Sequence, residues 1–345
     1  MSKSVIGITM GDPAGIGAEI IVKALKYKKI SEECIPVVFG DYEAIDDAIR
    51  FCHTKQKINI INTLDDIIDD SDTINLFDFG YLKKNGWEYK KVNAECGRAA
   101  FEYIVSAINY AMDKKIDAVV TGPINKESIH LAGKNYCGHT EIFAHYTDTK
   151  NYAMLLTSKQ LKVIHVTTHC ALCEVPKKAT RERVLEVIKL ANKAMNLLGI
   201  DKPKIGVAGL NPHSSENGLF GHEESTSIIP AINDAKELGI DVAGPESPDT
   251  VFVKALAGQY DIVVAMYHDQ GHIPLKLSGF KLDLRTNKYV SMSGVNSTIG
   301  LPIIRTSVDH GTAFGKAGEG RANEESMIDA IEMATLMARN FKKVE

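Results

Sequence analysis

The chain has 345 residues, and its 40 Lys and Arg against 44 Asp and Glu give a formal net charge of −4 at pH 7. Without a basic surplus, neither nucleic acid nor a membrane surface is expected as a partner, and the length suits two domains better than one. No apolar run approaches the ~20 residues of a membrane-spanning helix, and neither a signal peptide nor a regular cysteine framework is evident. We therefore expect a cytoplasmic protein with reduced thiols.

Short apolar runs alternate with amphipathic stretches along most of the chain. The first run, residues 5–9, predicts a buried strand, which is followed by a glycine loop and a helix over 17–25. The spacing of apolar residues predicts the clearest helix over 97–112, whereas the polar stretch 280–294 predicts a loop. Further strands are predicted over 35–39, 58–61, 117–121, 162–167, 204–210 and 261–266, and further helices over 42–51, 180–198 and 326–337. This alternation favours the α/β class, with a largely parallel sheet covered by helices.

Three of the predicted strands are followed, within two or three residues, by a histidine. These histidines are His169, His213 and His268. Ligands of open α/β sheets bind beyond the carboxyl ends of the strands, and neutral imidazole is the commonest metal ligand. The pattern therefore indicates a divalent metal site, with Asp269 as an orienting group or base. Loop or core histidines with ordinary hydrogen-bond partners would give the same spacing.

Two cysteines beside the first of these histidines form a short pair. Cys170 and Cys173 are separated by two residues, which is the spacing of a redox pair or of half a zinc site. No second cysteine pair has the spacing that a structural zinc site needs, so packed thiols are the favoured interpretation.

Two glycine-rich stretches and a few polar residues are candidates for binding phosphate or a nucleotide. Residues 11–17 lack the glycine spacing of a Rossmann fingerprint, so they form either a tight turn or an anion site at a helix start. Residues 310–323 would let a flat ligand approach the backbone, although an ordinary loop is an equal alternative. The candidate groups for an anion, each of which could instead be a surface charge or a helix cap, are Lys126, Thr140, Lys276, Asn296 and Arg305.

Seven segments that span nearly the whole chain, in order, resemble the 4-hydroxythreonine-4-phosphate dehydrogenase family. They are MGDPAGIGAEI from Met10, TGPINKESI from Thr121, GHTEIFA from Gly138, HVTTHCAL from His165, GLNPHSSENGLFGHEE from Gly209, AMYHDQGHIPLK from Ala265 and GVNSTIGLPIIRTSVDHGTAF from Gly294. The resemblance implies an isocitrate/isopropylmalate dehydrogenase-like fold of two α/β domains with an active-site cleft between them. We expect the first domain over residues 1–135 plus 297–345 and the second over 136–296.

The resemblance also assigns roles to individual residues. It implies metal ligands at His169, His213 and His268, and substrate contacts at His139, Thr140, Lys276, Asn296 and Arg305. The C-terminal glycine stretch resembles the loop that wraps the adenosine of NAD or NADP, which makes Gly311, Gly318, Gly320 and Asn323 the cofactor-binding candidates. It further implies a homodimer in which the partner subunit completes the active site. We expect one divalent metal per active site, zinc, cobalt, magnesium or manganese, and ligation by three histidines suits zinc, cobalt or nickel better than magnesium.

One departure from the biosynthetic members concerns the substrate. The stretch between Lys276 and Asn296 is longer, and His272-Ile273-Pro274 replaces the more common Leu-Pro-Val. The chain is similar in this to a sister branch that acts on 4-phospho-D-threonate and 4-phospho-D-erythronate. The expected reaction is oxidation at C3 and decarboxylation to dihydroxyacetone phosphate, with His139 as the first candidate for proton transfer and Asp249 and Asp269 as weaker ones.

Three other functions are kept as alternatives. The first is the 4-hydroxy-L-threonine 4-phosphate dehydrogenase of pyridoxal phosphate biosynthesis, whose substrate carries an amine at C2. A phosphate acyltransferase would share the broader fold without the histidines or the nucleotide loop. A metabolite-binding module without catalysis would not explain why metal ligands and such a loop occur together.

Overall fold

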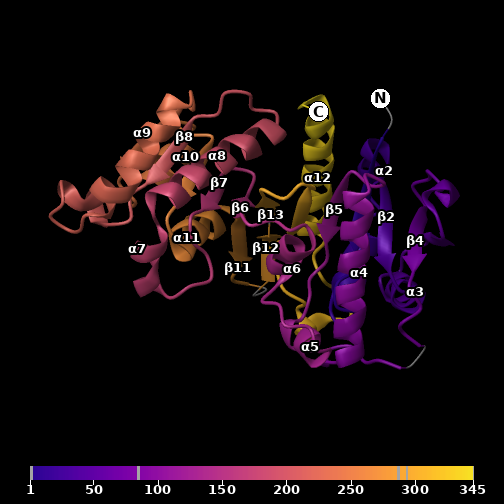
Figure 1. The fold of residues 1–345 in the computed structure, drawn as a ribbon. Helices are drawn as coiled ribbons and strands as arrows, with labels where there is room; N and C mark the ends of the chain where they lie inside the picture. Colours follow the sequence, from indigo (N-terminus) through magenta and orange to yellow (C-terminus); the bar gives the residue numbers. More distant parts are fainter. Residues whose placement is uncertain (1–2, 84–85, 286–287, 293, 345) are drawn as a thin grey trace. The chain divides into compact units, whose positions relative to one another are not determined.

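The computed structural model describes residues 3–83, 86–285, 288–292 and 294–344 (Figure 1). Contacts divide the chain into two compact units. Unit 1 comprises Met1–Lys150 and Leu301–Lys342, and unit 2 comprises Asn151–Gly300 and Lys343–Glu345. Within the described residues, no helix combines the length and the apolar character needed to cross a membrane.

Unit 1 contains a parallel sheet in the strand order β3-β4-β2-β1-β5-β14. The strands are β1 (Ser4–Thr9), β2 (Cys34–Gly40), β3 (Lys57–Ile60), β4 (Thr73–Asp78), β5 (Ala118–Thr121) and β14 (Arg305–Val308). The central strands β1 and β5 are almost completely buried, which fits their near-continuous apolar sequences. The C-terminal part of the chain thus returns to pair with β5, the strand after which one of the predicted anion sites begins.

Some of the helices of unit 1 begin after an asparagine that caps them. The helices of this unit are α1 (Gly17–Ala24), α2 (Lys28–Glu33), α3 (Tyr42–Phe51), α4 (Ala94–Met112), α5 (Lys126–Leu131), α6 (His139–Tyr146) and most of α12 (Glu325–Val344), with short 3-10 turns at Leu64–Asp66 and Phe314–Lys316. Helix α4 packs on β1, β2 and β5. It starts three residues before the predicted residue 97, because the Asn93 side chain accepts hydrogen bonds from the backbone N–H groups of Glu95 and Cys96.

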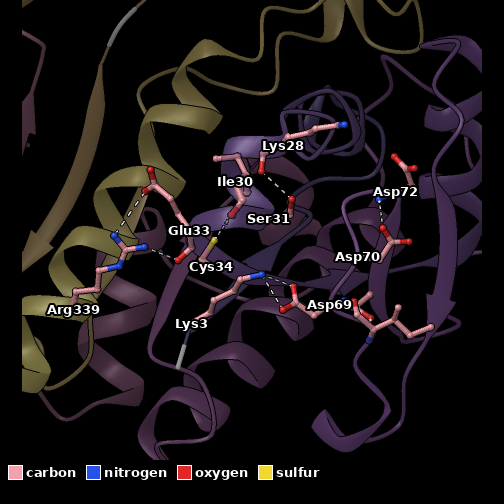
Figure 2. Close-up of polar contacts among 12 residues, drawn as sticks. Lys3, Lys28, Ile30, Ser31, Glu33, Cys34, Asp69, Asp70, Asp72 and Arg339 are labelled. Atoms are coloured by element: carbon pink, nitrogen blue, oxygen red, sulfur yellow. Dashed lines mark hydrogen bonds and ion pairs between the residues drawn. The ribbon is translucent and has the colours of Figure 1, made fainter. Parts of the chain in front are cut away.

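Helix α2, which the sequence pattern does not reveal, is fixed at its C-terminal end by the long helix α12. Figure 2 shows Arg339 of α12 donating a hydrogen bond of 2.6 Å to the backbone carbonyl of Glu33. The last carbonyls of a helix have no partner within it, so a cation there satisfies one of them. In the same view, Lys3 pairs with Asp69 at 2.8 Å, and the Cys34 thiol donates to the carbonyl of Ile30. All six cysteines are free thiols.

Unit 2 contains a mixed sheet in the order β13-β6-β7-β10-β8-β9. The strands are β6 (Ala153–Thr157), β7 (Lys162–His165), β8 (Ile205–Ala208), β9 (Val242–Glu246), β10 (Ile262–Ala265) and β13 (Val295–Ile299). Strand β6 is antiparallel to β7 and β13, and the remaining pairs are parallel. The parallel part therefore contains the three strands after which the predicted metal ligands follow.

A two-stranded hairpin replaces the loop that was predicted over residues 280–294. Strands β11 (Phe280–Asp283) and β12 (Lys288–Met292) pair antiparallel, with an irregularity after Lys281. The loop prediction was wrong because it was based on the overall polarity of the stretch and not on its alternation of apolar and polar residues. The alternation of apolar and polar residues in Phe280–Asp283 and the neighbours Tyr289 and Val290 are the strand signals that it missed.

Helices and short turns connect the strands of unit 2. They are α7 (Val175–Lys178), α8 (Arg181–Leu197), α9 (Ile229–Glu237), α10 (Val251–Leu256) and α11 (His268–Gly279), with turns at Leu172–Glu174, Pro212–Glu216 and Glu224–Ile228. The prediction of a helix over 180–198 is confirmed by α8, which Thr180 caps by accepting from the Arg183 N–H. Part of the core joins β7, β8 and β10 to α10 and α11 through Val163, Ala208, Val263, Phe252 and Leu275.

Gly97 of α4 provides a test of how α4 and α5 pack. A Cβ at this position would lie 2.0 Å from the backbone oxygen of Ser128 on α5. Glycine to alanine inside a helix normally stabilises by about 0.5–1 kcal/mol. Here we expect Gly97→Ala to lower the free energy of unfolding by about 1–3 kcal/mol, because the two backbones must separate. Urea denaturation would measure this, with Ser106→Ala on the same helix as the control, and a stabilised Gly97→Ala variant would contradict the packing.

Candidate active site

Two of the three predicted metal ligands lie together in unit 2. Strands β7 and β10 are parallel neighbours in which His165 pairs with Ala265, so the residues that follow them meet at one edge of the sheet. The ring centres of His169 and His268 are 5.7 Å apart. With metal–nitrogen bonds of about 2.1 Å, two imidazoles on one ion have ring centres roughly 5 Å apart. The spacing of this pair therefore fits two ligands of a common divalent ion, and both side chains are accessible.

A carboxylate orients the second histidine of this pair. The Nδ1 of His268 lies 2.6 Å from Oδ1 of Asp269, and this hydrogen bond holds the pKa of Asp269 below its usual value. An ionised carboxylate accepts, so Nδ1 carries the proton and Nε2 keeps a lone pair for a ligand. This is the orienting role considered for Asp269 from the sequence.

Two further histidines pack against His268, and sequence reasoning did not assign them to the site. His272 stacks on His268 with ring centres 3.6 Å apart, and its Nδ1 lies 2.9 Å from the His268 carbonyl. His165 is fully buried at the end of β7, 4.8 Å from His272 between ring centres. Burial lowers the pKa of His272 to about 4 and that of His165 to about 3, so both rings are neutral near pH 7. The spacing of four residues between His268 and His272 on a helix is the signal that could have found this stack.

The third predicted ligand, His213, lies in a strained turn after β8. Five consecutive residues, His213–Asn217, have left-handed φ values of 50°, 52°, 66°, 43° and 57°. The left-handed conformation costs roughly 1–2 kcal/mol for each such residue, and strain of this kind concentrates at functional sites. Glu224, which is 1% exposed, holds the approach to the turn by accepting from the backbone N–H groups of Leu210 and Asn211. His213 itself is exposed.

The structure does not bring His213 to the other two histidines within one chain. Among the residues described, no three His, Cys, Asp or Glu side chains are grouped closely enough to hold a metal ion. The neighbour of His213 is instead Asp249 at the start of α10, whose pKa is lowered first by a hydrogen bond from Ser247 and to a smaller degree by His213. The same finding gives no support to a metal site at Cys170 and Cys173.

The other predicted residues of unit 2 lie on α11 and on β13. Lys276 is exposed two turns after His268, with its ammonium 5.7 Å from the centre of the Phe280 ring. Asn296 lies on β13, and its Oδ1 is buried without a hydrogen-bond partner in the described part of the chain. A buried amide oxygen without a donor is a position where a ligand hydroxyl or amine would gain a hydrogen bond.

A cavity of about 590 Å³ opens between α10 and α11. Asp249 and Asp269 are among its lining residues. Most of its wall is apolar, and it includes the exposed side chains Val253, Leu256, Ile273 and Leu277. Apolar side chains gathered at an exposed surface indicate a binding or association face.

A second group of predicted residues lies in unit 1, around Arg305. This side chain is 3% exposed, donates from Nη2 to Thr121 Oγ1 at 2.8 Å and lies over the Phe143 ring. Burial lowers the pKa of Arg305 to about 9, which still leaves it charged at neutral pH. Burial, followed by the charges of Arg305 and Lys126, holds the pKa of His139 well below its usual value. A neutral imidazole beside two cations suits the binding of an anion and the transfer of a proton.

His139 and Thr140 are the first two residues of α6. The N-cap is Gly138, so Thr140 is not the capping residue, which leaves its hydroxyl available for another role. The Nε2 of His139 is buried and makes no hydrogen bond to the residues described, while a hydrogen bond with the Gly122 backbone holds the ring.

The two glycine-rich stretches differ in what their glycines do. In the first, Gly11, Gly15 and Gly17 are buried, and a Cβ on Gly17 would lie 1.9 Å from the Met10 carbonyl, so this is a packed turn rather than an open anion site. In the second, Gly318 and Gly320 have φ of +74° and +70°, which favours glycine whatever binds there.

Asn323 closes the second stretch, where its side chain accepts from the Glu325 N–H at the start of α12. This contact gives Asn323 a capping role in the chain itself.

Comparison with known proteins shows one family along almost the whole chain. Residues 32–334 match the family described as pyridoxal phosphate biosynthetic protein PdxA. The D-threonate 4-phosphate dehydrogenase of Cupriavidus necator is 44% identical over 97% of this chain and 97% of its own. Crystal structures of 4-hydroxythreonine-4-phosphate dehydrogenases from Klebsiella pneumoniae and Burkholderia phymatum are each 42% identical, with TM-scores of 0.85 and 0.83. They cover 97% and 98% of this chain and 100% and 99% of theirs, so the predicted family and fold are confirmed.

The packed turn after β1 contains a carboxyl group whose ionisation should affect stability. Asp12 is fully buried, accepts from the Ala14 N–H at 2.8 Å, and has a pKa raised by burial from 3.8 to about 6. A raised pKa means that stability is fully present below pH 3.8 and is lost, by about 3 kcal/mol, as the pH rises through 6. We expect Asp12→Asn to gain stability over the natural chain at pH 8 but much less at pH 5.

Urea denaturation at the two pH values measures this difference. The exposed Asp65→Asn is the matched control, because it removes a surface carboxyl from the same unit. A gain for Asp12→Asn that is the same at pH 5 and pH 8 would show that this carboxyl does not titrate in that range.

Proposed function

The chain belongs to the pyridoxal phosphate biosynthetic protein PdxA family, and we propose on that premise that it oxidises and decarboxylates 4-phospho-D-threonate or 4-phospho-D-erythronate. As a member of this family it is an NAD-dependent, decarboxylating dehydrogenase of a phosphorylated hydroxy acid. The proposed reaction occurs at C3 and yields dihydroxyacetone phosphate. The name of the Cupriavidus necator relative supports this choice of substrate, as does the His272-Ile273-Pro274 sequence on α11.

The observation that carries the proposal is the pair of His169 and His268 with Asp269 behind it. We propose that these two histidines, together with His213, hold one divalent metal ion, and that Asp269 keeps the His268 lone pair directed at it. A metal bound there would supply Lewis-acid polarisation of the substrate oxygens. Ligation by imidazoles suits zinc, cobalt or nickel better than magnesium or manganese.

Anionic groups of the substrate would be bound by cations of two kinds. Arg305 is buried and held by Thr121 and Phe143, so its guanidinium is presented with little freedom, which suits a phosphate or carboxylate. Lys276 is an exposed charge, and the Oδ1 of Asn296 would accept from a substrate hydroxyl. Thr140, at the start of α6, would donate to the substrate from its hydroxyl.

His139 is our candidate for moving a proton. Its ring is neutral at pH 7 because burial and the charges of Arg305 and Lys126 all disfavour the imidazolium. A neutral imidazole accepts a proton from a hydroxyl that is being oxidised, and its unpartnered Nε2 is the atom available for this step. Asp249 and Asp269 are weaker candidates, since both carboxylates already accept hydrogen bonds, from Ser247 and His268 respectively.

We also propose that the active unit is a homodimer. Two observations support it: His213 lies apart from the other two histidines within one chain, and the apolar cavity between α10 and α11 is open at the surface. A second copy that covers this face and brings its own His213 turn would complete the metal site. The cofactor, NAD or NADP, would lie on residues 311–323.

The alternative substrate is 4-hydroxy-L-threonine 4-phosphate, the substrate of the biosynthetic members of the family. The names of the two crystal structures favour it, whereas the curated relative favours the phosphorylated aldonate. The two substrates differ at C2, where one carries an amine and the other a hydroxyl.

Turnover of defined substrates tests the proposed reaction. We expect NAD or NADP reduction, followed by absorbance, with 4-phospho-D-threonate or 4-phospho-D-erythronate and a divalent metal, and its loss when a chelator is added. Turnover of 4-phosphohydroxy-L-threonine alone would favour the biosynthetic alternative. If neither aldonate supports reduction of either nucleotide, the proposed substrate class is wrong.

Mixed dimers test whether the active site is shared. We expect His169→Ala and His213→Ala to be inactive as separate proteins, because each removes one proposed metal ligand. If the ligands come from different subunits, a heterodimer of the two variants has one site with both histidines intact and regains turnover. Co-expression with two affinity tags isolates that heterodimer, and Lys29→Met dimers mixed in the same way are the control. An inactive heterodimer would mean that both histidines act in the same subunit.

A further inference from the structure

The segment from Gly311 to Asn323 has little regular structure of its own, so its position depends on contacts with the rest of unit 1. At its beginning, the backbone N–H of Ile16 donates to the Thr312 carbonyl at 3.1 Å. Gly15 lies so close to Thr312 that a Cβ on Gly15 would be 2.9 Å from the Thr312 Cβ. The packed turn before α1 therefore fixes the first part of the segment.

The end of the segment is held by two charged side chains of α1. Glu19, which is 1% exposed, accepts from the Ala322 N–H at 2.5 Å, and Lys23 donates to the carbonyl of the same residue. Lys23 also pairs with Glu324 at 3.0 Å. Because Glu19 and Lys23 are four residues apart, they lie on the same face of α1 and hold both polar groups of one backbone residue.

Holding Ala322 with a buried carboxylate costs free energy, and we take this cost as a sign that the position of Ala322 is important. Burial raises the pKa of Glu19, so the carboxylate is held in surroundings that disfavour its charge. The other buried residues around it on α1, such as Ile20, Ile21 and Val22, are apolar and would suffice for packing. The Glu19 carboxylate and the Lys23 ammonium both bind backbone atoms of Ala322, so they fix where the chain lies at this residue independently of its side chain.

The glycines of the segment fall into two classes. Gly318 and Gly320 are left-handed and packed, the first against the Tyr89 ring and the second against the Phe51 carbonyl. Gly311 and Gly315 have no left-handed φ, and a Cβ on either would meet no atom within 4 Å among the residues described. Among the described residues, no neighbouring atom requires glycine at these two positions. A close approach by a ligand is a physical reason for a missing side chain at such open positions.

We propose that Gly311 and Gly315 face the bound dinucleotide, and that Glu19 and Lys23 position them by holding Ala322. The proposal rests on the proposed function, because it assumes that the dinucleotide lies on this segment. Under this proposal Gly315 contacts the dinucleotide, whereas Gly318 and Gly320 only pack against the rest of unit 1. Glu19 and Lys23 then affect the affinity for the cofactor.

Gly315→Ala tests the open side of the segment. The added methyl group enters empty space, so the urea unfolding midpoint should not fall, whereas the dissociation constant of NAD, measured by calorimetry, should rise about tenfold or more. Gly311→Ala should behave in the same way. Gly318→Ala is the contrasting variant, because its Cβ would lie 2.8 Å from the Tyr89 ring and its backbone is left-handed, so it should lose stability without NAD.

Glu19→Gln and Lys23→Met test the positioning pair. Glutamine still accepts from the Ala322 N–H but lacks the charge beside Lys23, so we expect a smaller effect than for Glu19→Ala. In each variant the KM for NAD should rise while kcat at saturating NAD and the KM for the phosphorylated substrate stay near those of the natural enzyme. Lys29→Met is the matched control, because Lys29 pairs with Glu332 of α12 at 2.7 Å outside the segment.

The outcomes separate this inference from the proposed function. If the natural enzyme binds NAD and Gly315→Ala and Glu19→Gln bind it equally well, the inference is overturned and the proposed function stands. If these variants lose kcat and stability but keep NAD affinity, the pair is only structural and the inference is again overturned. If the natural enzyme binds neither NAD nor NADP, both are overturned.

Discussion

The parallel pairing of β7 with β10 is the constraint on which the proposed metal site depends. Because His165 and Ala265 are in register, the residues that follow the two strands leave the sheet at the same edge. His169 and His268 are about a hundred residues apart in sequence. The pairing brings their ring centres to 5.7 Å, a spacing that fits two ligands of one metal ion. A slip of one residue would turn the side chains of a strand to the other face, and the apolar core of unit 2 opposes any such slip.

Buried carboxylates shape the loops that leave both sheets. Asp12 accepts from Ala14 in the turn after β1, Glu224 accepts from Leu210 and Asn211 after β8, and Glu19 accepts from Ala322 before α12. Each is at most 1% exposed, so each is held at an energetic cost. In return the carboxylate satisfies backbone N–H groups that a loop cannot pair by itself. The clearest example is the left-handed turn that carries His213. Its five strained residues follow directly after the backbone that Glu224 holds.

Burial also determines which histidines can act as neutral bases or ligands. His139, His165 and His272 all have lowered pKa values, chiefly because an imidazolium is disfavoured where water is excluded. Arg305 remains charged in a similar environment because its intrinsic pKa is far higher. In unit 1, the neutral His139 beside the charged Arg305 gives a pair of residues that can bind an anion and accept a proton. That combination supports the proposed oxidation of a phosphorylated hydroxy acid.

The sequence by itself determined the α/β class, the family, and the helices with clear periodicity and caps, such as α8 with Thr180. These features follow from local patterns, because residues only a few positions apart determine a helix face or a buried strand. The local sequence also indicated the hairpin β11–β12 through its alternation of apolar and polar residues. The prediction of a loop gave more weight to the polarity of the stretch.

Only the tertiary structure decided how the candidate residues are grouped. In the sequence His169, His213 and His268 are equivalent, whereas in the fold two of them pair and the third lies beside Asp249. The contact between His165 and His272 and the hydrogen bonds of Glu19 and Lys23 to Ala322 were likewise not visible in the sequence. Such contacts join residues that are distant along the chain or that lie inside regular elements, and their distances are set by strand order and packing rather than by spacing in the sequence.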